Sequence, residues 1–64
     1  MDKQNEEIIL ISQRLTELRL KQKMLRWTFE NSKGLPEHKM NAILDEKNRT
    51  DRYIEILEKR LKEL

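Results

Sequence analysis

Hydrophobic residues recur in both halves of the chain at alternating spacings of three and four, which places side chains on one stripe of an α-helix. In the first half this stripe consists of Ile8, Ile11, Leu15, Leu18, Gln22, Leu25 and Phe29. In the second half it consists of Met40, Ile43, Lys47, Thr50, Ile54, Leu57, Leu61 and Leu64. The stripes do not share one frame, because the first continued from Phe29 falls on Pro36 whereas the second restarts at Met40. The pattern therefore predicts two helices rather than one long helix.

The break between the stripes contains the only glycine and the only proline of the chain, Gly34 and Pro36. Gly34 suits the left-handed position directly after a helix, and Pro36 suits the first turn of the next helix, where its missing N–H is no loss. The remaining residues are mostly good helix formers. We therefore expect one domain over residues 1–64, with a first helix over about 4–33, a turn over about 33–36 and a second helix over about 36–63.

The two stripes predict a register for an antiparallel hairpin, in which residues facing each other have numbers that add to a nearly constant value. When Phe29 is paired with Met40, seven facing pairs, or layers, result, and the two residue numbers in each layer add to 68 or 69. Both residues are apolar in five of the seven layers. Gln22 then faces Lys47, which keeps polar with polar. In an alternative register the numbers of facing residues add to 72, and the charged Lys47 then faces the apolar Leu25. We expect an all-α, coiled-coil-like αα-hairpin in the first register, although two domain-swapped chains could make the same pairing.

Two further features follow from the preferred register. Arg19 lies beside Asp51 and Lys21 beside Glu46, and such exposed ion pairs select a register more than they stabilise it. The polar layer, which we define as the seam positions Gln22 and Lys47 with the adjoining Thr50, is typical of a device that fixes alignment at some cost in stability.

Apolar residues outside the seam gather on one lateral side of the predicted hairpin. The apolar side, as we call it, comprises Leu10, Leu20, Met24, Trp27, Ala42, Tyr53 and Ile56. A chain of 64 residues builds only a small core, so we expect a partner to cover this side. The favoured occupant is a second copy, giving a homodimeric four-helix bundle. A different protein is a second possibility, and a third is that these residues stay exposed while Trp27 folds back over the Phe29 end of the core.

Composition excludes most chemistry. There is no cysteine for a disulfide or a zinc site, and the single histidine, His38, cannot build a metal cluster with Glu37 alone. No nucleophile–base pair is within helical reach, so we expect no enzyme, no cofactor and no metal. The longest apolar run is only Ile8–Ile11, which predicts no membrane span, and the absence of cysteine fits the cytoplasm.

The charge balance leaves two hypotheses for function. The 14 basic and 12 acidic residues give a formal charge of +2, too small to indicate a nucleic-acid binder by charge alone. The first hypothesis is a small non-enzymatic protein-interaction module that acts as a regulator, inhibitor or adaptor. The alternative is a nucleic-acid-binding hairpin dimer that uses basic residues of the first helix near Trp27, namely Arg14, Lys21, Lys23 and Arg26.

Overall fold

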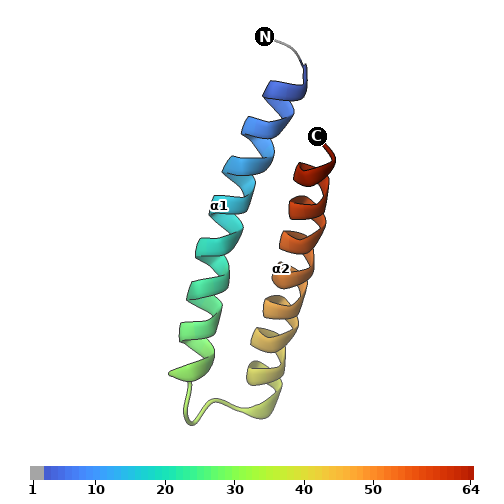
Figure 1. The fold of residues 1–64 in the computed structure, drawn as a ribbon. Helices are drawn as coiled ribbons and strands as arrows, with labels where there is room; N and C mark the ends of the chain where they lie inside the picture. The colour runs from blue at the N-terminus through green and yellow to red at the C-terminus, as the bar shows by residue number, and fades with distance from the viewer. Residues whose placement is uncertain (1–2) are drawn as a thin grey trace.

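The computed structural model describes residues 3–64 as two antiparallel helices joined by a short loop (Figure 1). Helix α1 spans Lys3–Glu30 and helix α2 spans Glu37–Glu63. Together they form a rod of 51 × 14 × 12 Å. At the open end of the rod the side-chain amide of Gln4 donates a hydrogen bond to the carbonyl oxygen of Leu64, so the first turn of α1 lies beside the C-terminal residue. The expected helical hairpin is confirmed.

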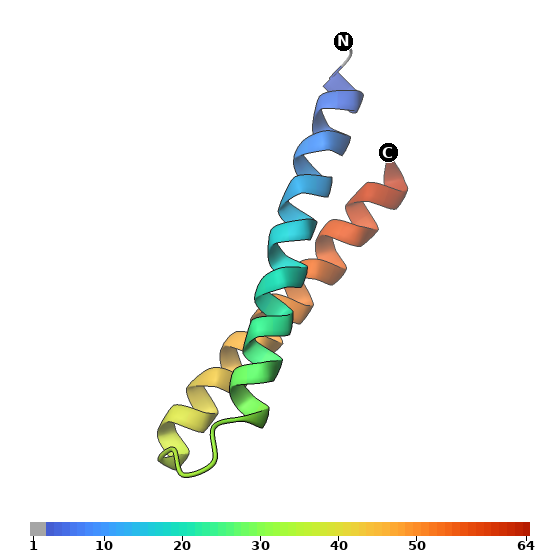
Figure 2. The same cartoon turned by 90° about the vertical axis from the view of Figure 1, so that its left-hand side faces the viewer.

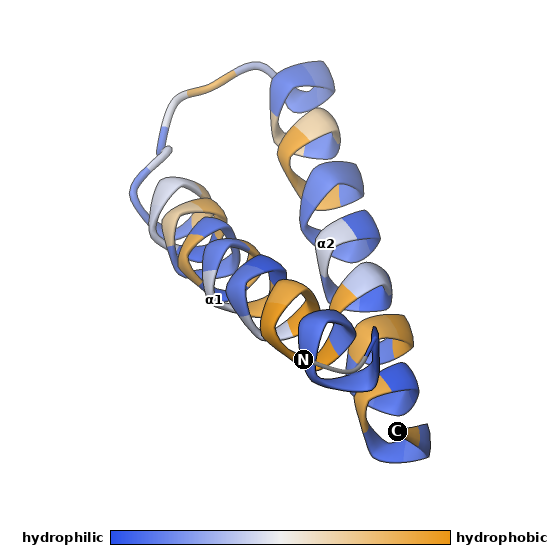
Figure 3. Cartoon of the chain, turned by 90° about the horizontal axis from the view of Figure 1, so that it is seen from above, coloured by the Kyte–Doolittle hydropathy of each residue, from blue (hydrophilic) through white to orange (hydrophobic). Residues whose placement is uncertain are grey.

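The predicted seam forms the contact between the helices. Every position of both stripes is buried or half-buried, and Ile11, Leu15, Leu18 and Ile54 make up the core. Seen along the rod, apolar segments of α2 turn toward α1 (Figure 3). The helices cross near the middle of the rod instead of running strictly side by side (Figure 2). Burial is accordingly deepest there, where Leu15 is only 3% exposed.

Contacts between the helices establish the register. One row of three cross-helix pairs runs beside the seam: Glu7 with Arg60 at 2.8 Å, Arg14 with its guanidinium carbon 5.8 Å from the Tyr53 ring centroid, and Lys21 with Glu46. The two residue numbers add to 67 in each pair. In the preferred register the seam layers add to 68 or 69, so a sum of 67 is expected for a row that lies directly beside the seam. In the alternative register, with seam layers of 72, Lys21 would lie beside Arg49 or Thr50 instead of Glu46. The structure therefore confirms the preferred register and the predicted Lys21–Glu46 pair.

The first helix is shorter than predicted, since it ends at Glu30 and not at about residue 33. Beyond it, the Asn31 side-chain amide donates to the Trp27 carbonyl oxygen at 2.8 Å. The Ser32 hydroxyl donates to the Phe29 carbonyl oxygen at 2.8 Å. Short polar side chains that satisfy the last carbonyls in this way compete with continuation of the helix, which accounts for the earlier end.

The turn uses Gly34 differently from the prediction. The Leu35 amide donates to the Ser32 carbonyl oxygen at 3.2 Å, which places Gly34 at the third position of a β-turn. Its φ of 94° confirms the expected positive value, but Gly34 lies in the loop rather than directly after α1. Pro36, with φ −57° and ψ 148°, immediately precedes α2 and is not part of its first turn. The expected start of the second helix at about residue 36 moves to Glu37.

Candidate interaction surface

The apolar side predicted from the sequence is exposed in the hairpin. All seven of its side chains are exposed, including Trp27 at 66% and Leu10 at 65%. Trp27 consequently does not cover the Phe29 end of the core. The opposite lateral side has one comparably exposed large apolar residue in the described chain, Ile9 at 46%. Large apolar side chains concentrated on one side of a small protein are typical of an interaction surface.

A layer of charged residues divides the apolar side into two patches. Glu17 lies seven residues after Leu10 and seven before Met24, so it occupies the same stripe of α1 between them. Arg49 lies in the same way between Ala42 and Ile56 on α2. The end patch therefore comprises Leu10, Tyr53 and Ile56, and the turn patch comprises Leu20, Met24, Trp27 and Ala42.

The charged layer is held together by ion pairs within the chain. Arg14 contacts Glu17 at 3.0 Å on α1. On α2, Arg49 contacts Glu46 at 3.7 Å, and Glu46 also accepts a hydrogen bond from Lys21 of α1. This bond and the charge of Lys21 hold the pKa of the Glu46 carboxyl below its usual value. The charged layer, defined by these five residues, is thus an ordered feature of the apolar side.

An open depression lies at the turn patch. It has a volume of about 400 Å³ and is lined by Lys23, Met24, Trp27 and Thr28. All four residues belong to α1, so the depression is a hollow on the surface of one helix and encloses no site between the two helices. Its apolar floor and basic rim suit a contact with a side chain of another protein.

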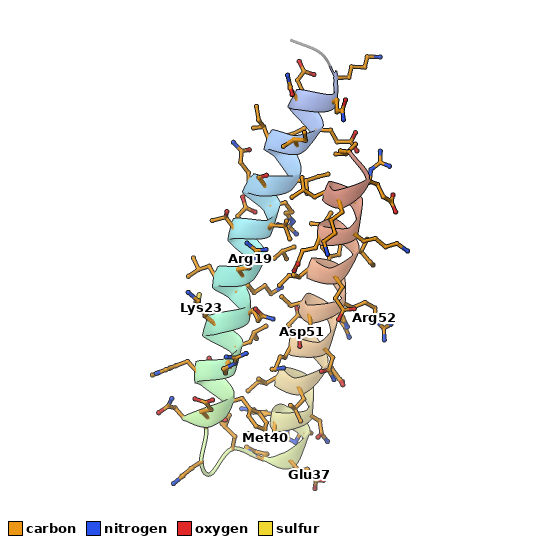
Figure 4. The ribbon with its side chains drawn as sticks, viewed as in Figure 1. Arg19, Lys23, Glu37, Met40, Asp51 and Arg52 are labelled. Carbon is orange, nitrogen blue, oxygen red and sulfur yellow. The ribbon has the colours of Figure 1, made fainter. Side chains whose placement is uncertain are left out.

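The polar layer contains a residue that the sequence interpretation did not include. The amide of Gln22 donates to one oxygen of Asp51 at 2.6 Å, and the ammonium of Lys47 donates to the other oxygen at 3.0 Å. Asp51 lies between the two helices (Figure 4). The hydrogen bond from Gln22, followed by that from Lys47, lowers the pKa of the Asp51 carboxyl. Gln22 and Lys47 are therefore linked through a shared carboxylate.

The predicted pair between Arg19 and Asp51 is wrong, because Asp51 bonds to Gln22 and Lys47. In the structure Arg19 contacts Glu58 instead, at 3.9 Å. Thr50, expected beside the polar layer, is only 3% exposed, and its hydroxyl donates to the Glu46 carbonyl oxygen at 2.8 Å. Asp51 could have been found from its spacing, because it follows Lys47 by four residues, the separation at which helical side chains meet.

The four basic residues proposed for nucleic-acid contact fall into two groups. Arg14 and Lys21 lie along the apolar side and already contact Glu17 and Glu46. Residues two apart on a helix point in nearly opposite directions, so Lys23, which lines the depression, and Arg26 lie on a different face of α1 from Lys21. Figure 4 shows Lys23 on the side of α1 away from α2. This arrangement does not favour a single phosphate-binding surface.

Over residues 3–64 the structure shows no group of three or more His, Cys, Asp or Glu residues that could hold a metal ion. Neither helix in that range is long and apolar enough to cross a membrane. No family model, curated protein or solved structure matches this chain. The apolar side and the polar layer are therefore the features from which a function is inferred.

Proposed function

We propose that this chain is a small, non-enzymatic protein-interaction module that acts through its apolar side, and that its first partner is a second copy of itself. The observation that carries the proposal is the exposure of the end patch and the turn patch on one side of the hairpin. Burying a large apolar side chain contributes about 1.5–3 kcal/mol. Covering both patches would add substantially to a fold whose own core is small.

The resulting assembly is a four-helix bundle made of two hairpins. Such a module acts by occupying a surface of another protein, as a regulator, inhibitor or adaptor, and we place it in the cytoplasm because it lacks cysteine. An outside partner would replace the second copy at the depression beside Trp27, since Trp and Met are enriched among residues that anchor protein interfaces.

Light scattering coupled to size exclusion tests the proposal. The native chain is expected at twice the 7.9 kDa mass of one copy. Two variants separate the patches: one changes Leu10, Tyr53 and Ile56 to Ser, and the other changes Leu20, Met24 and Trp27 to Ala. We expect each to shift the mass toward that of a monomer. Ile9→Ala, an exposed apolar residue on the opposite side, is the matched control and should leave the mass unchanged.

The outcomes are distinct. A native chain that is monomeric at 0.1–1 mM, roughly the range in which weak interfaces saturate, contradicts self-association. A dimer that neither triple variant disturbs shows that the copies meet elsewhere. If only the end-patch variant shifts the dimer toward the mass of a monomer, the turn patch remains available for a different protein.

A further inference from the structure

In the two rows nearest the seam on the apolar side, residues that face each other across the hairpin are complementary. In the inner row the pairs that touch are Glu7–Arg60, Arg14–Tyr53 and Lys21–Glu46. The same register sets a second, outer row of residues opposite each other, with numbers that add to 66: Lys3–Glu63, Leu10–Ile56, Glu17–Arg49 and Met24–Ala42. Each outer pair is either apolar with apolar or opposite in charge.

We propose that the second copy packs on this side with its hairpin running in the same direction, related by a two-fold axis parallel to the rod. Helix α1 of each copy then lies on α2 of the other, and both turns are at the same end. The inference rests on the proposed self-association and adds the orientation of the partner and the residues that define it.

The reason is geometric. A two-fold axis along the rod sets each residue of α1 over the partner's copy of the residue that it already faces within its own hairpin. Leu10 therefore meets the partner's Ile56, and Glu17 meets the partner's Arg49. Every complementary pair of the two rows is repeated between the copies, so the apolar residues of the outer row meet apolar residues of the partner and charges meet opposite charges.

The opposite arrangement lacks this complementarity. A two-fold axis across the rod, centred so that both patches are covered, sets α1 on the partner's α1. Glu17 then meets the partner's Glu17, Arg49 meets the partner's Arg49, and Arg14 meets the partner's Lys21. Like charges brought together at an interface oppose association strongly. Sliding the copies to avoid these contacts leaves one patch uncovered.

The charged layer therefore has a definite task in the dimer. Its members are already paired within each chain, so none enters the interface as an isolated charge. The end patch and turn patch supply the apolar area, and the charged layer between them selects the direction.

Distance measurement between spin labels tests the orientation directly. The chain has no cysteine, so Lys33→Cys in the exposed turn gives a single labelling site. In the same-direction dimer the two labels should be separated by well under half of the 51 Å length of the rod, whereas the opposite arrangement separates them by most of that length. A monomer by light scattering overturns the proposed function. A dimer with the long distance overturns only this inference.

Charge reversal provides a second test that does not depend on labelling. Glu17→Arg and Arg49→Glu should each raise the dimer dissociation constant about tenfold or more, because each sets like charges against each other between the copies. An equimolar mixture of the two variants should recover dimerisation, since Arg at 17 then meets Glu at 49.

Glu55→Lys, on the other lateral side of α2, is the matched control, and helix content by circular dichroism verifies folding. Single variants that dimerise as well as the native chain, or a mixture that does not recover, would overturn the orientation.

Discussion

Gln22 of α1 and Asp51 of α2 are joined across the hairpin by a hydrogen bond of 2.6 Å. The other oxygen of the same carboxylate accepts the ammonium of Lys47, so three polar residues share one bonded network. Within residues 3–64 no buried side-chain nitrogen or oxygen lacks a hydrogen-bond partner. A satisfied polar network at a helix seam fixes alignment, because shifting either helix by a turn would leave its groups facing hydrocarbon.

Replacing both Gln22 and Lys47 with Leu should raise thermal stability and weaken the choice of register. Two half-buried apolar side chains add to the seam, while Asp51 loses two hydrogen bonds but remains 34% exposed and can be hydrated. We expect a net gain of about 1 kcal/mol, which corresponds to a rise in Tm of about 4–8 °C. Calorimetry at fixed protein concentration measures the rise, and light scattering reports mixed oligomers. A lower Tm would show that the network stabilises the fold.

Acid should destabilise the hairpin partly through Asp51. Its pKa is lowered in the folded state, so the unfolded chain binds the proton more readily and stability rises with pH. The contribution is complete above the unfolded carboxyl pKa of about 3.9 and is lost as pH falls toward the lower folded value. Thermal melts at pH 2–6, roughly spanning this window, should show a shallower acid dependence for Asp51→Asn. Asp45→Asn, an exposed residue of the same helix, is the control, and an equal slope for both variants would contradict the prediction.

Exchanging the charges of Lys21 and Glu46 should show whether their contact sets the register. Both side chains are more than one third exposed, so solvent screens the pair and it contributes little to stability. Lys21→Glu alone should lower Tm by a few degrees, because it places two carboxylates together. The double variant with Glu46→Lys restores opposite charges and should return Tm close to that of the native chain. If the double variant does not regain the native Tm at low salt, the contact does not act through charge.

Gly34→Ala should destabilise the turn by about 1–2 kcal/mol, because φ at this position is 94° and a Cβ is unfavourable there. A methyl group at position 34 would meet no other atom within 4 Å, so the cost comes from the backbone conformation alone. Gly34→Asn should cost less, since Asn tolerates positive φ. Chemical unfolding of the three chains measures the order. An Ala variant as stable as the native chain would contradict the assigned backbone conformation.

The seam and its register were predictable because they depend on many positions at once. A shift in register would misplace several apolar residues, and only one alignment kept Gln22 opposite Lys47. The exposed patches were predictable for the same reason, since the seam determines which residues lie outside it. Patterns of this kind depend only on the helical period, which varies little between proteins.

Details that depend on single side chains were not predictable in the same way. The end of α1 is decided by Asn31 and Ser32, whose competition with the backbone does not alter the hydrophobic pattern. Asp51 moved from its expected place beside Arg19 because Gln22 and Lys47 together offer two donors to one carboxylate, and a pairwise comparison of charges does not consider such sharing.

The contact between Gln4 and Leu64 at the open end of the rod has a consequence for connectivity. Because these residues touch, a short linker could join them while the chain is cut within the loop at residues 31–36, producing a circular permutant. Closing a loop of a few residues costs little entropy at either end. Such a permutant should keep the pairing of the two helices, and the fold of this hairpin would then be a property of its matched surfaces, independent of the order in which the helices are synthesised.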